Sequence, residues 1–321
     1  MAEPGKAAPT FVMVTICTRD RPILLDACLA SVCAQAVPEG VRLEIAVIEN
    51  NDRLTCEPIL AKHRAASGLA IHGVPEPELG IPFTRNRCGT FAAEQGADWL
   101  LYIDDDETAQ PGWLARMVEA SRTYDADVLY GRVMAVYPSG TPAWMQVKER
   151  NKRPNGTALS KAEGHNTLVR TKLFAADGMN LRFDTALRFT GGSDTDFFSR
   201  AHQAGAKIIW VGDAIVDEIV PASRMTLGWQ LNRTFRVAIS ISVLHEKQRG
   251  RASAVLRSVS KGTGRILEGI VRAPLGLVAI VSPEAGKKLA FKAAKQFYSG
   301  LGSFAYIAGV RPQPYRKVDG G

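Results

Sequence analysis

Long apolar segments are missing from this chain of 321 residues. The longest apolar stretch, residues 273–281, is far shorter than the roughly 20 residues that a membrane-spanning helix needs. The N-terminus carries no apolar stretch of the kind found in a signal peptide. These two absences predict a soluble or peripheral protein of the cell interior.

Cysteine is scarce and unpaired in pattern. The five cysteines are odd in number and none forms a C-x-x-C pair, which argues against a disulfide framework or a zinc site and favours a reducing compartment. Neither the phosphate-binding G-x-x-x-x-G-K-[ST] loop nor the dinucleotide-binding G-x-G-x-x-G motif is present. With 46% apolar and 22% charged residues, the composition excludes a disordered or collagen-like chain.

The formal charge of +8 is unevenly distributed. From Pro221 to the end there are 17 Lys and Arg against 4 Asp and Glu, a balance of +13, whereas the first 220 residues carry −5. Such a basic half predicts contact with something acidic, either nucleic acid or a phospholipid surface. A solvated basic face is the alternative.

The first 220 residues alternate between strand-like and helix-like segments. Strands are expected at residues 11–17, 43–50, 99–103, 126–137, 165–171 and 207–211, and helices at residues 23–37, 54–67, 84–95, 111–123 and 194–203. This alternation predicts right-handed βαβ units and a mostly parallel sheet. Residues 137–160, rich in Pro, Gly, Asn and Lys, are expected to form a mobile surface loop.

Beyond Pro221 the pattern changes to long basic helices, expected at residues 225–246, 252–271 and 283–298. The sequence therefore predicts an α/β catalytic domain over residues 1–220 and a basic helical appendage over residues 221–321.

Three polar clusters follow expected strands, at residues 18–21, 49–52 and 104–107. Ligands of open parallel sheets bind at the carboxyl ends of the strands. In an extended segment Asp104 and Asp106 would face one site together, and carboxylate oxygens suit Mg²⁺ or Mn²⁺. The alternative is a solvated acidic turn, or a helix cap before Pro111.

A second group, T-G-G-S-D-T-D-F-F at residues 190–198, precedes an expected helix. Its two glycines allow close approach of the backbone to a ligand, and Asp194 falls in or near the first helical turn. The alternative is a simple helix cap formed by Ser193 or Asp194.

Together these segments resemble the family 2 glycosyltransferases, which are inverting enzymes of the GT-A fold that use nucleotide-diphosphate sugars. The resemblance spans residues 11–241 in order: V-T-I-C-T-R-D-R at 14–21, I-E-N-N at 48–51, G-I-P-F-T-R-N-R-C-G at 80–89, I-D-D-D-E at 103–107, G-H-N-T-L-V-R at 164–170, G-G-S-D-T-D-F at 191–197, and a P-x-x-R…W…R-x-x-R region from Pro221 to Arg236.

The resemblance implies a role for each matched residue. Asp194 would be the catalytic base and Asp106 would hold a divalent ion. Donor contacts would come from Thr18, Arg19, Arg21, Glu49, Arg85, Asp104, Asp105, Arg233 and Arg236. Sugar or acceptor contacts would come from His165, Asn166, Gly192 and Trp229; a locally bonded, structural His165 is the alternative.

Three departures from the family pattern matter. Glu49 stands where Asp is usual, and Ser193 replaces an acidic residue before Asp194. The Arg233-x-x-Arg236 pair lacks the Q-x-x-R-W form and the membrane spans of processive synthases. We therefore expect transfer of one sugar per encounter, from a UDP-sugar to a saccharide or lipid-linked saccharide, as in exopolysaccharide-type enzymes.

Two other classes fit less of the sequence. A sugar-1-phosphate nucleotidyltransferase would need a glycine-rich loop after the first strand, and residues 18–21 contain no glycine. A nucleic-acid-binding protein would explain the basic appendage but not the acidic loop or the net negative domain. No nucleic-acid partner is therefore expected, and the oligomeric state is left open.

The last expected helix has two unlike faces. Lysines 287, 288, 292 and 295 fall on one face, and Leu289, Ala293, Phe297 and Gly300 fall largely on another. Such a helix is typical of a membrane interface, which predicts a peripheral protein on the cytoplasmic, anionic face of a membrane. The alternative is that the apolar face packs on the protein itself.

Overall fold

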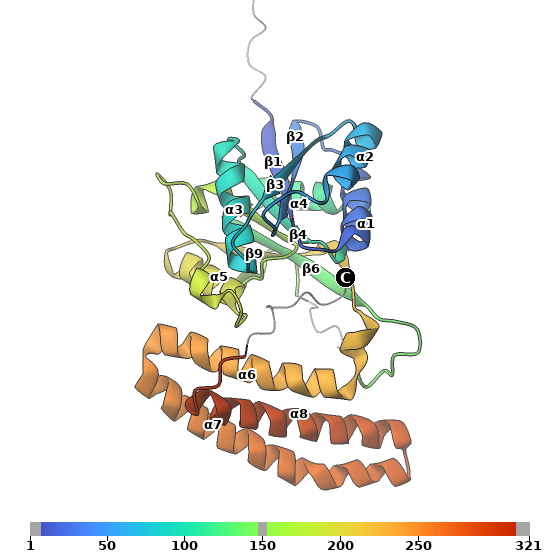
Figure 1. Cartoon of the computed structure of the whole chain (residues 1–321), viewed down its shortest axis with the longest axis vertical. Helices are drawn as coiled ribbons and strands as arrows, with labels where there is room; N and C mark the ends of the chain where they lie inside the picture. The colour runs from blue at the N-terminus through green and yellow to red at the C-terminus, as the bar shows by residue number, and fades with distance from the viewer. Residues whose placement is uncertain (1–7, 147–152, 313–321) are drawn as a thin grey trace, which may run out of the picture.

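The computed structural model describes residues 8–146 and 153–312. It has two parts: an α/β domain and, beneath it in Figure 1, a layer of three long helices.

The first half of the domain repeats strand and helix. Parallel strands β1 to β4 are joined by helices α1 to α3; their bounds are β1 (Thr10–Thr18), α1 (Pro22–Cys33), β2 (Val41–Glu49), α2 (Glu57–Ser67), β3 (Ala70–Pro75), α3 (Ile81–Glu94) and β4 (Trp99–Asp104). Pro22, Pro58 and Pro82 each stand in the first helical turn, where a missing N–H costs nothing. Strand β3 was not predicted: it is short and lies at the edge of the sheet, within a stretch rich in Pro and Gly.

The second half completes the sheet with β5 (Glu107–Ala109), α4 (Trp113–Thr123), β6 (Val128–Val136), β7 (Ala158–Leu159), β8 (Thr167–Arg170), α5 (Ser193–Gln203) and β9 (Ile208–Ile219). The strand order is β3-β2-β1-β4-β8-β6-β9-β5, with β7 paired to β9. Strand β8 runs antiparallel to both β4 and β6, whereas β6 and β9 are parallel. The predicted α/β class with a mostly parallel sheet is confirmed.

Strand β1 is central and is buried on both faces. Val12, Val14 and Ile16 pack in one core cluster with side chains of α1, α2 and α4. Phe11 and Met13 point the other way, into a second cluster with side chains of α3 and α5. Helices therefore cover both faces of the sheet, as Figure 1 shows, and only the strand ends remain for a site.

The segment expected to be a mobile loop, residues 137–160, is partly ordered by packing. Residues 147–152 lie outside the described part. On either side of them, Ala158–Leu159 pairs with β9 and Trp144 meets Phe291 edge-on, with ring centroids 5.1 Å apart. The loop thus touches the helical layer.

The helical layer contains α6 (Leu227–Arg249), α7 (Arg251–Arg272) and α8 (Pro283–Ile307), with a 3₁₀ segment, Ala273–Ile280, between α7 and α8. Helix α8 packs on both other helices through glycines: a Cβ at Gly302 would lie 2.3 Å from Phe235 O, and one at Gly300 would lie 2.7 Å from Gly262 O. In the described part of the chain, no helix is long and apolar enough to cross a membrane.

This packing corrects part of the prediction that the apolar face of α8 is free to enter a membrane. Ala293 and Gly300, both assigned to that face, are buried against α7, whereas Leu289 is partly buried and Phe297 is exposed. Lys295, assigned to the lysine face, is itself half-buried. This part of the predicted apolar face is not a free surface, because its small residues allow the neighbouring helix to pack closely against it.

Helix α6 fastens the layer to the domain. Lys247 Nζ lies 2.6 Å from Asp184 Oδ2 and 2.8 Å from Oδ1 of the buried Asp196. Ser240 Oγ donates a hydrogen bond of 2.6 Å to the carbonyl of Thr190. These contacts of α6 therefore extend to the loop that precedes α5.

Candidate active site

The strand register brings the predicted polar clusters together. In the β1–β2 ladder Thr18 pairs with Glu49, and in the β1–β4 ladder Cys17 pairs with Asp104. All three clusters therefore meet at the carboxyl ends of neighbouring strands, as the sequence predicted.

The side chains of the four acidic residues 104–107, at the end of β4 and directly after it, do not alternate between two faces of an extended strand. The chain turns at Asp105 and Asp106, and the acidic side chains go to different partners. Asp105 is buried and accepts hydrogen bonds from Thr18 Oγ1 at 2.8 Å and Arg21 Nη1 at 2.9 Å. Asp106 Oδ2 lies 3.6 Å from the same Arg21 nitrogen. The expectation that Asp104 and Asp106 are alternate residues of an extended segment is therefore wrong, and their sharing of one site stays a prediction.

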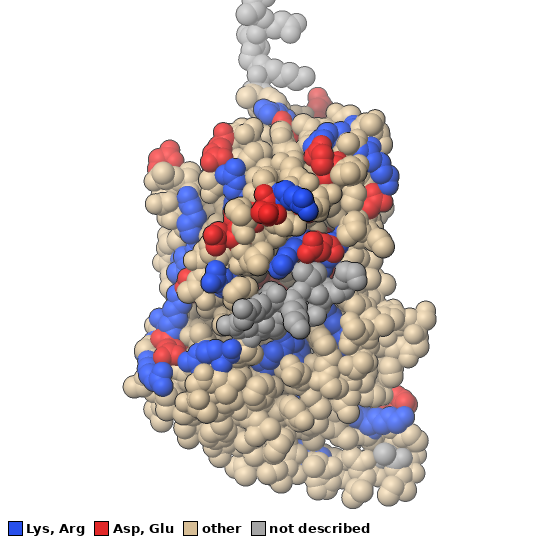
Figure 2. Space-filling model, in the orientation of Figure 1, with Lys and Arg blue, Asp and Glu red and all other residues tan. Residues whose placement is uncertain are grey.

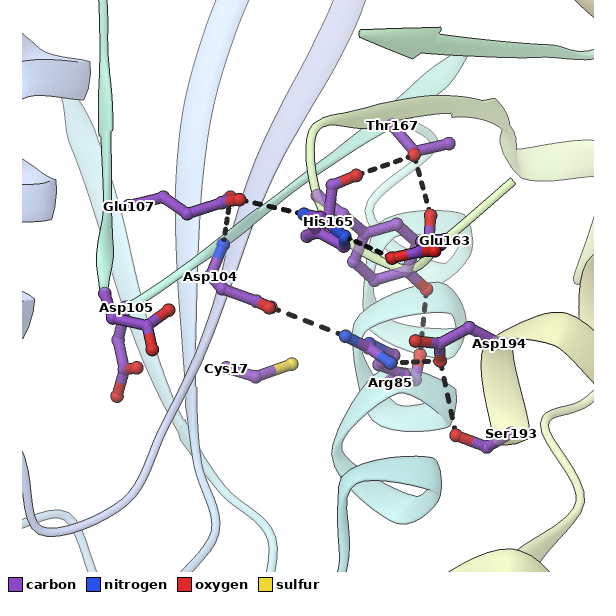
Figure 3. Close-up of polar contacts among 12 residues, drawn as sticks. Cys17, Arg85, Asp104, Asp105, Glu107, Glu163, His165, Thr167, Ser193 and Asp194 are labelled. Atoms are coloured by element: carbon purple, nitrogen blue, oxygen red, sulfur yellow. Dashed lines mark hydrogen bonds and ion pairs between the residues drawn. The ribbon is translucent and has the colours of Figure 1, made fainter. Parts of the chain in front are cut away.

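Arg85, on α3, lies between two carboxylates (Figure 3). Its Nη1 pairs with Asp194 Oδ1 in a short contact, and its Nη2 lies 3.4 Å from Asp104 Oδ1. Burial raises the pKa of Asp104 to about 8, although Arg85 opposes this shift. Gly164 leaves the room that the guanidinium needs, because a Cβ there would lie 2.4 Å from Arg85 Cζ.

His165 forms a second bridge, also visible in Figure 3. Its Nδ1 lies 2.9 Å from Glu107 Oε1 and its Nε2 lies 2.8 Å from Glu163 Oε2. Burial alone would lower the pKa of His165, but Glu107 and Glu163 raise it well above the usual range. Both ring nitrogens lie within hydrogen-bonding distance of a carboxylate oxygen, an arrangement that favours the protonated imidazole, which can donate at both nitrogens.

Asn166, predicted to contact sugar or acceptor, is fully buried. Its Oδ1 accepts from Trp113 Nε1 at 2.7 Å, and its Nδ2 donates to the carbonyls of Arg132 and Ala214 at 2.7 and 2.9 Å. Because these bonds use its donors and engage its acceptor, the expectation of a direct contact is corrected: Asn166 supports the site from inside the domain.

Glu49 is buried as well. Its carboxylate accepts hydrogen bonds from the backbone of Thr55 at 2.6 Å and of Cys56 at 3.1 Å, and from the Thr55 hydroxyl. These donors lie just before α2, so Glu49 orders that turn. Its contact with a nucleotide base stays a prediction.

The loop before α5 needs both of its glycines. Gly191 and Gly192 have φ of 79° and 88°, a region that favours glycine. A Cβ on Gly192 would lie 2.8 Å from Leu244 Cδ1 of α6. Gly192 directly precedes α5, whose first turn contains Asp194, and Ser193 Oγ lies 3.2 Å from Asp194 Oδ1. Helix α6 thus supports the backbone that carries Asp194.

Two arginines lie near the ring of Trp229 on α6: Arg224, in the 3₁₀ turn Ala222–Met225 before α6, and Arg233, on α6 itself. Their guanidinium carbons lie 5.8 and 5.9 Å from the centroid of the Trp229 ring. Arg236 lies further along α6, and its buried Nε has no hydrogen-bond partner among the described residues. Arg19, by contrast, forms its one ion pair within the described part of the chain with its neighbour Asp20, at 3.7 Å.

Comparison with known proteins shows the family to which the chain belongs. The profile described as "Glycosyl transferase family 2" matches residues 13–177. The chain is 33% identical over 224 residues to "Succinoglycan biosynthesis protein ExoM" of Rhizobium meliloti (strain 1021), covering 70% of this chain and 71% of that protein. The chain belongs to glycosyl transferase family 2.

Solved structures agree with the GT-A fold expected of this family. The structure of S. aureus TarS 1–349 in complex with UDP superposes with a TM-score of 0.53 at 14% identity, covering 93% of this chain and 92% of that one. GalNAc-T7 with UDP, GalNAc and Mn²⁺ gives 0.53 at 16% identity, covering 77% and 52%. The chain spans 43% of a longer TarS structure, with a TM-score of 0.51 at 16% identity. The predicted family and fold are confirmed.

Two acidic residues of this family 2 site escaped the sequence analysis. Glu163 contacts His165, and Glu218 of β9 pairs with Glu107 in the β5–β9 ladder. Burial and then the charge of Asp106 raise the pKa of Glu218. Neither carried a signal in the sequence, because β5 was not predicted and β9 extends eight residues past its predicted end at Val211.

Metal binding was tested against the same geometry. Among residues 8–146 and 153–312, no three His, Cys, Asp or Glu side chains converge to hold an ion. Asp106 can serve as a single protein ligand, because its carboxylate lies partly exposed on the turn after β4, although Arg21 Nη1, 3.6 Å from its Oδ2, would compete with the ion. An ion there would draw its remaining ligands from a substrate or water.

Proposed function

We propose that this family 2 chain is an inverting enzyme that transfers one sugar from a UDP-sugar to a saccharide acceptor in exopolysaccharide synthesis. The name of the relative ExoM supports succinoglycan-like synthesis. The TarS 1–349 structures that hold UDP or UDP-GlcNAc support a UDP-sugar donor. The observation that carries the proposal is the placement of Asp194 on α5, tied through Arg85 to Asp104 at the end of β4.

Asp194 acts as the base. In the transfer its carboxylate takes the proton of the acceptor hydroxyl, whose oxygen bonds to the anomeric carbon of the sugar. The bond between that carbon and the diphosphate breaks on the opposite face, and nucleoside diphosphate leaves. Arg85 pairs with both Asp194 and Asp104, and it thereby orients the Asp194 carboxylate toward the end of β4.

A divalent ion, Mn²⁺ or Mg²⁺, would be held by Asp106. Support comes from the oxygen donors after β4 and from the GalNAc-T7 structure with Mn²⁺. When bound, the ion stabilises the charge that grows on the leaving diphosphate. Thr18 and Arg21 hold Asp105 and keep the turn that presents Asp106 in place.

A lipid-linked acceptor would bring the chain to a membrane. The connection between α7 and α8 carries an exposed apolar tip, defined as Val271, Leu275, Leu277, Ile280 and Val281; Ile280 is 85% and Val281 is 89% exposed. Arg272 and Lys287 flank this tip. An apolar tip with flanking cations matches an anionic membrane surface, so we place the peripheral contact at the tip and not along α8.

Sedimentation with vesicles of anionic phospholipid tests the membrane contact. Replacing Ile280 and Val281 by Asp removes apolar surface and adds negative charge, and we expect binding to fall at least about tenfold. Ile23→Asp is the matched control, because Ile23 on the α/β domain is 84% exposed and lies on α1, outside the tip. Equal loss in both variants, or none in either, would refute this placement.

A thermal-shift panel of nucleotide-diphosphate sugars, with and without Mn²⁺, tests the donor. A ligand that binds only the folded chain raises its melting temperature, and we expect the largest rise with a UDP-sugar plus Mn²⁺. Asp106→Ala should lose the Mn²⁺-dependent part and keep the folded state. No shift with any nucleotide sugar would refute the proposed function, whereas a shift and turnover that EDTA leaves unchanged would refute only the ion.

A further inference from the structure

Helix α7 turns its small residues toward the protein and its large apolar residues toward the surroundings. Its buried residues are Ala254, Ser258, Gly262 and Gly269. Gly262 and Gly269 lie against α8: an added Cβ would lie 3.0 Å from Phe304 Cε2 and 3.0 Å from the carbonyl oxygen of Ala293, respectively. Because these small residues allow the two helices to approach closely, packing fixes which face of α7 is turned inward.

Four exposed apolar side chains form a stripe along another face of the helix. We call this the α7 stripe, and it consists of Leu256, Val259, Leu267 and Ile270. Successive members are three, eight and three residues apart, close to whole turns of an α-helix, so they share one face. A helix of a soluble protein normally buries such a face against its own core. A contiguous apolar surface that is exposed instead indicates an interaction site.

The α7 stripe is part of a larger apolar surface. Val271, which follows Ile270 on α7, belongs to the exposed tip defined above. Ile270 also lines a cavity of about 290 Å³ between α7 and α8, together with glycine, alanine, phenylalanine and tyrosine residues. In Figure 1 α7 forms the edge of the layer that lies farthest from the α/β domain. Figure 2 shows few charged side chains over that edge on the face in view.

The charge of α7 indicates what covers this surface. The helix contains five Lys and Arg residues and one Glu. Lys261 and Arg272 are exposed, and Arg257 directly follows Leu256 of the stripe. A second copy of the chain docked on the stripe would bring two basic helices together, which like-charge repulsion opposes. An anionic bilayer, by contrast, attracts the basic residues and accepts the apolar side chains.

We propose that α7 lies flat in the interface of an anionic phospholipid membrane, with the α7 stripe facing the hydrocarbon. The contact then extends from the tip along the helix, and the layer lies between the membrane and the α/β domain. The inference rests on the proposed function, in which a lipid-linked acceptor brings the enzyme to a membrane. Leu256 and Val271 are 15 residues apart in the sequence. They are therefore about 22 Å apart along the helix axis, so a contact confined to the tip would not involve Leu256.

Sedimentation of the full chain with vesicles of phosphatidylcholine and phosphatidylglycerol tests this contact. We expect Leu256→Asp to weaken binding at least about fivefold, because it places a charge in the apolar stripe. Leu256→Phe keeps the apolar surface and should bind within about twofold of wild type. Ile23→Asp is the matched control, because Ile23 is 84% and Leu256 is 73% exposed, and Ile23 lies on the α/β domain. It should bind as wild type does, and vesicles of phosphatidylcholine alone should bind wild type less tightly.

Other results would overturn the proposal. If Leu256→Asp binds vesicles as wild type does, and the variant of Ile280 and Val281 does not, the contact is confined to the tip. If wild type sediments as a dimer without vesicles and Leu256→Asp sediments as a monomer, the stripe binds a second copy of the chain. If wild type binds no vesicles, the membrane contact is wrong, whereas the thermal shift with UDP-sugars still decides the proposed function independently.

Discussion

The α/β domain and the helical layer treat charge in opposite ways. In the domain, buried cations are matched: Arg85 lies between Asp104 and Asp194, and His165 lies between Glu107 and Glu163. In the layer the cations are mostly exposed, among them Arg249, Lys261 and Lys292. The domain therefore holds its cations against carboxylates around the candidate site, whereas the layer presents its cations to the surroundings. This difference fits our proposal, in which the domain supplies the chemistry and the layer supports the loop before α5.

The largest expected effect separates chemistry from binding within the domain. Asp194→Asn keeps the size of the side chain but cannot take a proton, so the turnover rate should fall by about 10²–10⁴-fold. UDP binding should stay within about twofold, because the substitution leaves the cations of the site in place. Asp177→Asn, an exposed position outside the site, is the control and should turn over normally. Normal turnover by a folded Asp194→Asn variant would remove Asp194 from the mechanism.

The next prediction tests the contact between the two regions. Gly192→Ala places a Cβ against Leu244 and strains a residue with φ of 88°, so the free energy of unfolding should fall by about 2–4 kcal/mol. Gly68→Ala has a similar φ of 70° but open space around it, and should cost only about 1 kcal/mol. Denaturant titration measures both. In the double variant Gly192→Ala/Leu244→Ala the losses of unfolding free energy should be less than additive, because the smaller side chain removes the clash. Equal losses in the two glycine variants would contradict the contact.

A smaller effect is expected for the ion pair that joins α6 to the domain. Lys247→Met leaves the buried Asp196 with Arg200 as its single cation among residues 8–146 and 153–312, which should cost about 1–3 kcal/mol of unfolding free energy. The control is Lys62→Met, which removes the exposed Lys62–Asp26 pair and should cost less than about 1 kcal/mol. Hydrogen exchange should also quicken in residues 190–196 of the Lys247 variant. Unchanged exchange there would mean that α6 does not hold the loop.

The smallest effect is a change in pH dependence. The pKa of Asp104 is raised from 3.8 to about 8, so folding retains a proton that the unfolded chain releases, and stability falls as the pH rises between these values. Asp104→Asn removes this term. Its melting temperature should therefore gain on wild type between about pH 5 and about pH 8. A gap that stays constant over this range would contradict the raised pKa.

Most of the domain could be predicted because its signals are local. Apolar runs in the sequence predict β1, β2 and β4, and prolines in the first helical turn predict the starts of α1 and α3. Strand β5 has three residues and β3 is a short strand at the edge of the sheet. Neither is long enough to show a periodic pattern of apolar residues.

The site could be predicted only as far as its motifs reach. The order of the motifs led to Asp194, Arg85 and Asp104, and the structure brings these together. The inward turn of Asp105 and the burial of Asn166 depend on partners far away in the sequence. The close packing of α8 on α6 at Gly302 likewise depends on tertiary contacts that no local pattern contains.

The most direct measurement is the configuration of the bond that the enzyme makes. The chain would be incubated with an α-linked UDP-sugar and a lipid extract from cells that lack this transferase, and the anomeric coupling of the new linkage read by proton NMR. A single carboxylate base on α5 with departure of the diphosphate from the opposite face predicts a β-linked product. An α-linked product would contradict the account, because retention requires a different arrangement of groups around the sugar.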